Sequence, residues 1–162
     1  MLELYVLPED REIVREVLRK RGAIYGGYLR DVIAGEEPND IDIILSELRY
    51  GLEFIKYLLS KGYQLDYEDK NDSIIATKSG ARKLELAFVE DSPDEVLIGP
   101  VAGPDFDVNL LMLGEDGVLR NWMNPNEDII EIIENITSRR AVRIEADRDR
   151  IRKMSQKGYT IV

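Results

Sequence analysis

The sequence of 162 residues contains no cysteine and no histidine. Without these residue types the chain can form no disulfide, no Cys/His zinc site, no thiol nucleophile and no Ser-His-Asp triad. Any chemistry must therefore use carboxylates, lysine, arginine, tyrosine, hydroxyl groups or the backbone.

Long hydrophobic runs are also missing. No apolar stretch approaches the roughly 18 to 20 residues that a membrane-spanning helix needs. The N-terminal MLELYVLPED lacks the basic region and the long apolar stretch of a secretory signal. We therefore expect a cytoplasmic protein without a membrane partner, and the apolar fraction of 44% suits one compact core.

A net positive charge is also missing: the 32 acidic residues outnumber the 22 basic ones, so the formal net charge is −10. This balance argues against a surface that binds nucleic acid throughout, since phosphate contacts depend on Lys and Arg. The segment 138–157 is the exception, with eight basic and three acidic residues. A polyanion such as RNA should meet this segment first, although a solvated helix face with internal ion pairs explains the same charges.

Apolar periodicity and turn signals predict strands and helices in mixed order, without a regular βαβ alternation. Strands are expected at 2–6, 23–25, 40–45, 73–77 and 83–89. Helices are expected from Pro8 to before Gly22, at 28–34, over about 14 residues capped by Ser46, at 127–134 and at 145–157. The range 105–113 fits either element, and 91–104, with two Gly-Pro dipeptides, is predicted as a loop. The fold class is therefore α+β, a mixed sheet of about five strands flanked by helices, plus a short C-terminal helical segment.

Asp40 and Asp42 alternate with Ile41 and Ile43 at the start of an expected strand. Successive side chains of a strand point to opposite faces, so the two carboxylates share one face. Like charges this close are costly without a cation between them, and oxygen ligands suit Mg²⁺ or Mn²⁺. A metal site is one interpretation, and a solvated pair of aspartates at a strand start is the other.

Gly26 and Gly27 separate the strand expected at 23–25 from the helix expected at 28–34. A glycine turn at this position lets backbone N–H groups approach a phosphate at the positive end of a helix. Arg30, one turn into the helix, can reach the same region. The alternative is a tight turn beside a surface pair of Arg30 and Asp31.

The segment 26–44 joins both features in the pattern G-G-x-x-R-D-x-x-x-G-x-x-x-x-D-x-D. This pattern resembles the first motif of the tRNA nucleotidyltransferase and poly(A) polymerase family, the bacterial-type CCA-adding enzymes of the DNA polymerase beta-like superfamily. The residues in register are Gly26, Gly27, Arg30, Asp31, Gly35, Asp40 and Asp42. The resemblance implies a catalytic nucleotidyltransferase head at 1–137 and a basic helical extension at 138–162, similar to the start of a neck domain.

Two further segments extend the resemblance. Glu85 lies where the family has a third acidic catalytic residue, and it could equally be a strand-surface residue. The run from Asp105 to Asn109 resembles the family's R-R-D-F-T-[IV]-N segment, which implies that Asp105 and Asn109 hold the incoming nucleotide with Gly26, Gly27 and Arg30. Gly103 and Pro104 replace the two arginines, which removes positive charge from the implied triphosphate pocket.

Asp147 and Arg150 could correspond to the family's E-D-x-x-R element, in which an Asp and an Arg on one helix face bind the base edge. Their spacing suits neighbours on a helix. The pairs Glu145/Arg148 and Asp149/Arg152 repeat this spacing, and Ala146 stands where the family has Glu. A surface ion-pair pattern is therefore the competing interpretation.

The resemblance implies metal-dependent transfer of NMP from an NTP to a hydroxyl, most simply at the 3′ end of an RNA such as tRNA, contacted through 138–157. Two alternatives stay open: a protein or small-molecule hydroxyl as acceptor, and a non-catalytic nucleotide-binding module. The helical body and tail that grip tRNA in the family are absent from these residues. We therefore expect a minimal enzyme, a protein partner or homo-oligomer, or an acceptor smaller than tRNA.

Overall fold

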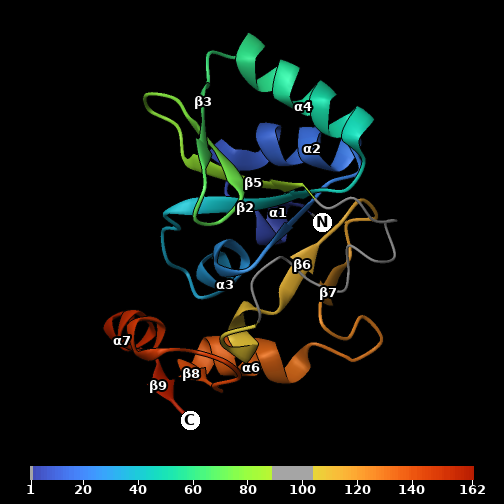
Figure 1. Cartoon of the computed structure of the whole chain (residues 1–162). Coiled ribbons are helices and arrows are strands. Elements are labelled where there is room, and N and C mark those ends of the chain that lie inside the picture. Colours follow the sequence, from blue (N-terminus) through green and yellow to red (C-terminus); the bar gives the residue numbers. More distant parts are fainter. Residues whose placement is uncertain (1, 89–103) are drawn as a thin grey trace.

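Seven strands form one mixed sheet in the computed structural model, which describes residues 2–88 and 104–162 (Figure 1). Their order is β3-β4-β5-β2-β1-β6-β7. The bounds are Ala23–Tyr25 for β1, Asp40–Leu45 for β2, Gln64–Glu68 for β3, Ser73–Thr77 for β4, Lys83–Phe88 for β5, Leu111–Leu113 for β6 and Leu119–Asn121 for β7. β2 and β5 run parallel, and the other neighbouring pairs run antiparallel.

Some helices pack on this sheet, and others lie beyond one end of it. Their bounds are Leu2–Tyr5 for α1, Arg11–Arg19 for α2, Gly27–Ile33 for α3, Leu48–Ser60 for α4, Ile130–Ser138 for α6 and Arg148–Gln156 for α7, with short 3-10 turns η1 at Pro8–Asp10 and η2 at Asp107–Asn109. α2 packs on β1, α3 on β1 and β2, and α4 on β2. Figure 1 shows α2 and α4 together on one side of β2 and β5, with α6 and α7 at the far end from α4.

The alternation of residues in β2 decides which face is buried. Ile41, Ile43 and Leu45 are at most 1% exposed and belong to the hydrophobic core. Phe54 and Leu58 of α4 are fully buried in the same core. Because side chains alternate, Asp40 and Asp42 lie on the opposite face of the sheet.

The expected fold class is confirmed, and the sheet has seven strands instead of about five. β3 and the short β7 were not expected, nor was the parallel pair of β8 (Arg140–Ala141) and β9 (Thr160–Ile161). The range 105–113 divides into η2 and β6. The loop predicted at 91–104 lies, except for Pro104, outside the described residues.

Two local predictions were wrong. Residues Leu2–Tyr5 form a helix instead of a strand, because a run of five residues is too short for its alternation to distinguish the two. Ser46 does not cap α4: its hydroxyl donates to the carbonyl of Arg21 at 3.1 Å, and Glu47 precedes the helix without a side-chain cap bond.

The helices expected near 8–21, 28–34, 47–60, 127–134 and 145–157 are present with shifted ends, the last two as α6 and α7. Within residues 2–88 and 104–162, no helix has both the length and the apolar composition needed to cross a membrane.

Candidate active site

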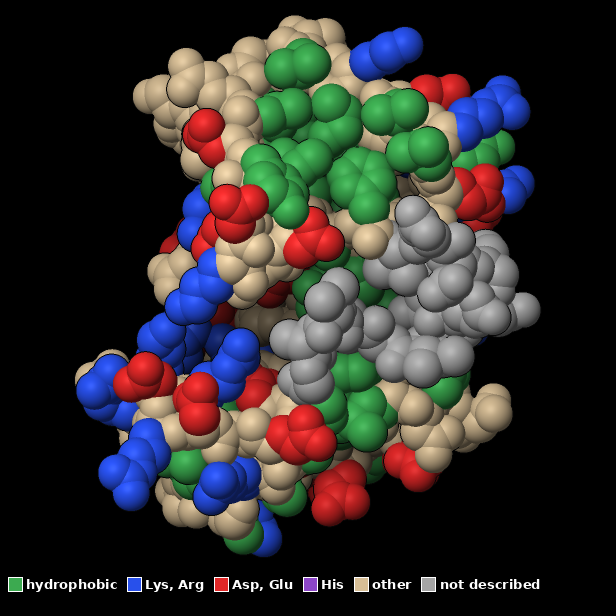
Figure 2. Space-filling model, in the orientation of Figure 1, with side chains coloured by type: hydrophobic (Ala, Val, Ile, Leu, Met, Phe, Trp, Pro, Cys, Tyr) green, Lys and Arg blue, Asp and Glu red, His purple; other side chains and the backbone are tan. Residues whose placement is uncertain are grey.

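A cleft of about 900 Å³ opens on the face of the sheet that carries Asp40 and Asp42. Every site residue predicted from the sequence lines it: Gly26, Gly27, Arg30, Asp40, Asp42, Glu85, Asp105, Asn109, Asp147 and Arg150. Figure 2 shows a hollow between the upper and lower parts of the molecule, with Lys and Arg side chains along its left rim. The fold thus brings together residues from four separate stretches of sequence.

The acidic side of the cleft is built by the parallel strands β2 and β5. Asp42 is the direct partner of Glu85, and Asp40 is the partner of Lys83. Lys83 Nζ lies 3.7 Å from Asp40 Oδ2, and the Ser73 hydroxyl donates to Glu85 Oε1 at 3.3 Å. Three carboxylates therefore share one face of the sheet, with a single half-exposed lysine beside Asp40.

Asp42 is a carboxylate of this cluster whose protonation is shifted. Burial, together with the nearby charges of Asp40 and Glu85, raises the pKa of the Asp42 carboxyl to about 8. Burial, together with Asp42, Glu85 and Asp40, also raises the pKa of the adjacent Tyr25 hydroxyl. Both shifts reflect burial first and the neighbouring negative charges second.

The same residues fit a divalent cation. Asp40 and Asp42 offer oxygen ligands from one face, and a cation between them would relieve the repulsion that raises the Asp42 pKa. Among the described residues, no group of three or more acidic side chains is arranged to hold a metal ion. Mg²⁺ is commonly bound by one or two carboxylates, and waters and phosphate oxygens complete its coordination shell.

Gly26 allows the chain to turn next to Asp42. Its φ of 75° lies in the left-handed region, and a Cβ built there would be 3.7 Å from Asp42 Oδ2. Its N–H donates to the carbonyl of Leu111 in β6 at 3.0 Å. Gly26 therefore gives the turn its conformation and keeps space free beside Asp42, while its own N–H is bonded within the sheet.

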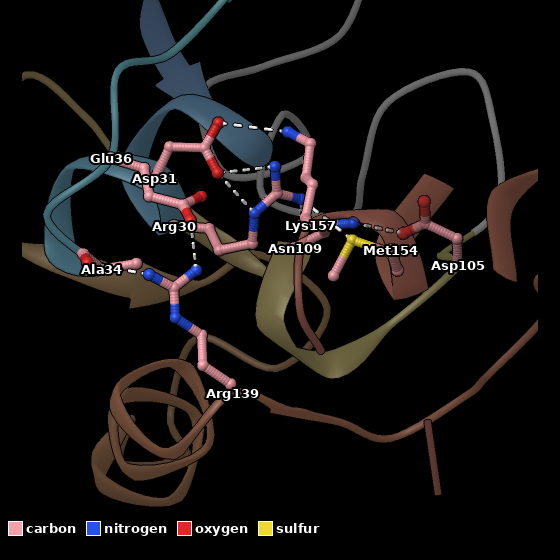
Figure 3. Close-up of polar contacts among 9 residues, drawn as sticks. All are labelled: Arg30, Asp31, Ala34, Glu36, Asp105, Asn109, Arg139, Met154 and Lys157. Atoms are coloured by element: carbon pink, nitrogen blue, oxygen red, sulfur yellow. Dashed lines mark hydrogen bonds and ion pairs between the residues drawn. The ribbon is translucent and has the colours of Figure 1, made fainter. Parts of the chain in front are cut away.

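Arg30 is buried, with 5% of its surface exposed, and its guanidinium has protein partners (Figure 3). Its Nε donates to Asp31 Oδ1 at 2.8 Å, and its Nη1 donates to Asn109 Oδ1 at 2.5 Å. The alternative of a surface Arg30–Asp31 pair is excluded, since both residues are buried. Arg30 joins α3 to η2 and so fixes Asn109 at the cleft.

Asp105 and Asn109 belong to the same hydrogen-bond network. Asn109 Nδ2 donates to Asp105 Oδ1 at 3.0 Å, and Arg150 Nη1 of α7 lies 2.8 Å from Asp105 Oδ2. Asp147 is the N-cap of α7, where its Oδ1 accepts the N–H of Arg150 at 2.9 Å. The two residues predicted to read the base are thus engaged in a helix cap and an ion pair.

Sequence reasoning assigned no individual role to several residues that line the cleft, among them Trp122, Lys153 and Lys157. Trp122, the single tryptophan, donates its Nε1–H to the carbonyl of Asn109 at 3.1 Å. No sequence signal places it there, because β7 is too short to be recognised. Lys153 and Lys157 could have been found, since they follow Arg150 at helical spacing.

Solved structures share the α+β fold of this chain. A CCA-adding enzyme complexed with CTP matches 99% of this chain with a TM-score of 0.73 and 18% identity. The Thermotoga maritima CCA-adding enzyme complexed with tRNA matches 99% with a TM-score of 0.69 and 19% identity. A tRNA nucleotidyltransferase complexed with a primer tRNA and an incoming ATP analog matches 88% of this chain with a TM-score of 0.58 and 22% identity.

At these identities the likeness shows a common fold. The chain spans less than half of the matched proteins, namely 42%, 41% and 43% of their lengths. No protein-family model and no curated protein sequence matches the chain.

Proposed function

We propose that the protein is a nucleotidyltransferase that transfers NMP from an NTP to the 3′ hydroxyl of an RNA. The observation that carries this proposal is the placement of Asp40 and Asp42 on one face of β2, beside the Gly26 turn and inside the shared cleft. The common fold with CCA-adding enzymes bound to CTP and to tRNA supports the same chemistry and acceptor.

In the proposed reaction the acceptor hydroxyl oxygen attacks the α-phosphorus in line. The new O–P bond forms as the bond between the α-phosphorus and the oxygen that bridges it to the β-phosphorus breaks. Pyrophosphate leaves, and the proton of the hydroxyl passes to solvent water. Mg²⁺ or Mn²⁺, when bound, would activate the hydroxyl and neutralise charge on the triphosphate. Asp40 and Asp42 would hold the metal. Glu85, the strand partner of Asp42, would complete the site for the ion that activates the attacking hydroxyl.

The remaining cleft residues would bind and orient the nucleotide. Gly26 would let the phosphate chain approach beside Asp42, Gly27 leaves room for the guanidinium of Arg30, and Arg30 holds Asn109 in place. Asp105 fixes Arg150 at the rim of the cleft. The basic segment 138–157, with exposed Arg140, Arg143 and Arg148, would meet the RNA backbone.

Incubation with four α-labelled NTPs, Mg²⁺ and total RNA tests the proposal. We expect label at RNA 3′ ends and release of pyrophosphate, both lost in Asp42→Ala, while its melting temperature stays within a few degrees. An unchanged rate in this variant would remove the metal hypothesis. Parallel reactions with a protein fraction and with small-molecule hydroxyls identify the acceptor, and label there instead of on RNA would overturn the RNA assignment.

A second candidate is a non-catalytic nucleotide-binding module. The observation that favours it is Pro104. In the family segment that 105–109 resembles, an arginine stands at this position before the aspartate. Binding of NTP without label transfer to any acceptor class would support this candidate.

A further inference from the structure

One face of α7 is turned toward the cleft. Arg150, Lys153 and Lys157 follow one another at helical spacing, so they share that face, and all three line the cleft. Arg150 binds Asp105, and Lys157 Nζ lies 3.3 Å from Asp31 Oδ2. The two outer residues therefore anchor the helix at both ends of this face.

A buried contact holds the middle of the helix as well. Met154 is 4% exposed, and its Sδ lies 3.5 Å from Arg30 Nη1 (Figure 3). These contacts hold the helix, and the neighbouring Lys153 lines the cleft between the Arg150 and Lys157 bridges with its side chain exposed.

Within the described residues, the ammonium group of Lys153 has no protein partner, unlike the cationic groups of Arg30, Arg150 and Lys157. Arg30, Arg150 and Lys157 are each bonded to a carboxylate. Of the cations that line the cleft within 2–88 and 104–162, Lys70 and Lys153 form no hydrogen bond or ion pair. Lys70 lies in the β3–β4 connection, on the side of Ser73 and Glu85.

A triphosphate needs more positive charge than this cleft otherwise supplies. Asp40, Asp42 and Glu85 are acidic, and the guanidinium of Arg30 is already bonded to Asp31 and Asn109. A lysine is a flexible point charge with three donors, which suits phosphate oxygens. An unpaired lysine on a fixed helix face is therefore a ready phosphate ligand.

We propose that Lys153 binds the phosphate chain of the incoming nucleotide and supplies charge that the segment before Asp105 lacks. The inference rests on the proposed function, since it requires an NTP in this cleft. It assigns to α7 a contact with the phosphates that is independent of the base.

Equilibrium binding of ATP, CTP, AMP and CMP to the full chain, with Mg²⁺ and no acceptor, tests this assignment. Lys153→Met should weaken binding of both triphosphates about tenfold or more, as expected for loss of a charge-assisted hydrogen bond. Binding of both monophosphates should change less than about twofold, because they lack the terminal phosphates that the proposed Lys153 contact would bind. Lys153→Arg should keep most of the triphosphate affinity.

Arg152→Met is the matched control. Arg152 is the exposed neighbour of Lys153 on α7, its partner is Asp149 at 2.8 Å, and it does not line the cleft. It should bind all four nucleotides as the wild type does. Lys70→Met tests the other unpaired lysine and should leave triphosphate binding unchanged.

The outcomes separate the inference from the proposed function. Triphosphate binding by Lys153→Met equal to wild type, or a triphosphate-selective loss in Lys70→Met instead, overturns the inference and leaves the proposed function standing. Equal losses for triphosphates and monophosphates also overturn it, because they indicate a displaced helix. Failure of the wild type to bind any nucleotide overturns both.

Discussion

Asp42 of β2 and Glu85 of β5 are direct partners in a parallel strand pair, although α4 and the β3–β4 hairpin separate them in the chain. The pairing places two carboxyl groups side by side on the cleft face and contributes to the raised pKa of Asp42. A cluster built in this way destabilises the protein when no cation is bound. Binding of a cation at this cluster would therefore stabilise the protein.

The metal-free protein should lose stability as pH rises. The folded-state pKa of Asp42 is about 8, above its ordinary value of 3.8, so the folded state favours the protonated carboxyl. The stability that the protonated Asp42 contributes to the folded state is fully present below about pH 4 and is lost as the pH rises through about 8. Asp42→Asn, which removes the charge, should therefore raise the melting temperature by about 2 to 4 °C or more at pH 9 in EDTA, roughly 1 kcal/mol, and by little at pH 4.

Thermal melts of both proteins across this pH range check the prediction. Asp66→Asn, at an exposed carboxylate of β3, is the control and should show no comparable gain. A gain in Asp42→Asn that is equal at pH 4 and pH 9 would contradict the electrostatic explanation.

Asp147 allows its two roles to be separated. Its carboxylate caps α7 by accepting the N–H of Arg150, so Asp147→Ala should cost about 1 kcal/mol of stability. Asn caps a helix about as well as Asp but presents a different pattern of donors and acceptors. If Asp147 also reads the base, Asp147→Asn should keep the stability and change NTP preference in a transfer assay. The same preference among the four NTPs in wild type and Asp147→Asn would leave only the capping role.

Arg30 should matter more for stability than a surface arginine. Arg30→Met leaves Asp31, which is 3% exposed, with Lys157 as its remaining ion partner. Loss of one partner from a buried pair costs about 3 kcal/mol or more, which corresponds to a fall in melting temperature of roughly 6 to 12 °C.

The comparison variant is Arg139→Met. Arg139 pairs with Glu36 at 2.7 Å, but both side chains are about one-third exposed, so its loss should cost about 1 kcal/mol or less. Equal losses of melting temperature in the two variants would show that the Arg30 network is not a buried anchor between α3, η2 and α7.

Much of the fold is predictable because its patterns are long or strongly punctuated. The alternation in β2 gives the face of Asp40 and Asp42, and the glycines at 26 and 27 give the turn between β1 and α3. The missed strands are the edge strand β3, whose residues are mostly exposed, and strands of two or three residues such as β7. Their pairing comes from tertiary contacts and leaves no periodic signal.

The proposed site residues, which line one cleft, could be named from sequence, but their bonding could not. Sequence spacing brought Arg30 near the glycine turn, whereas its partner Asn109 lies 79 positions away in the chain and is paired only by the fold. Neither the capping of α7 by Asp147 nor the Arg150–Asp105 ion pair was predicted, since the helix was expected to begin at residue 145. The helical spacing of Lys153 from Arg150 is visible in the sequence, but the absence of a partner for its ammonium group among the described residues is a property of the fold.

Titration of the protein with Mn²⁺ in the presence of an NTP tests the metal site itself, independently of the acceptor. The wild type should bind Mn²⁺ with an affinity about tenfold or more above that of Asp40→Asn and of Asp42→Asn, because each change replaces an anionic carboxylate ligand of the same ion with a neutral amide. Equal Mn²⁺ affinity in the wild type and both variants would contradict a metal held between these two aspartates.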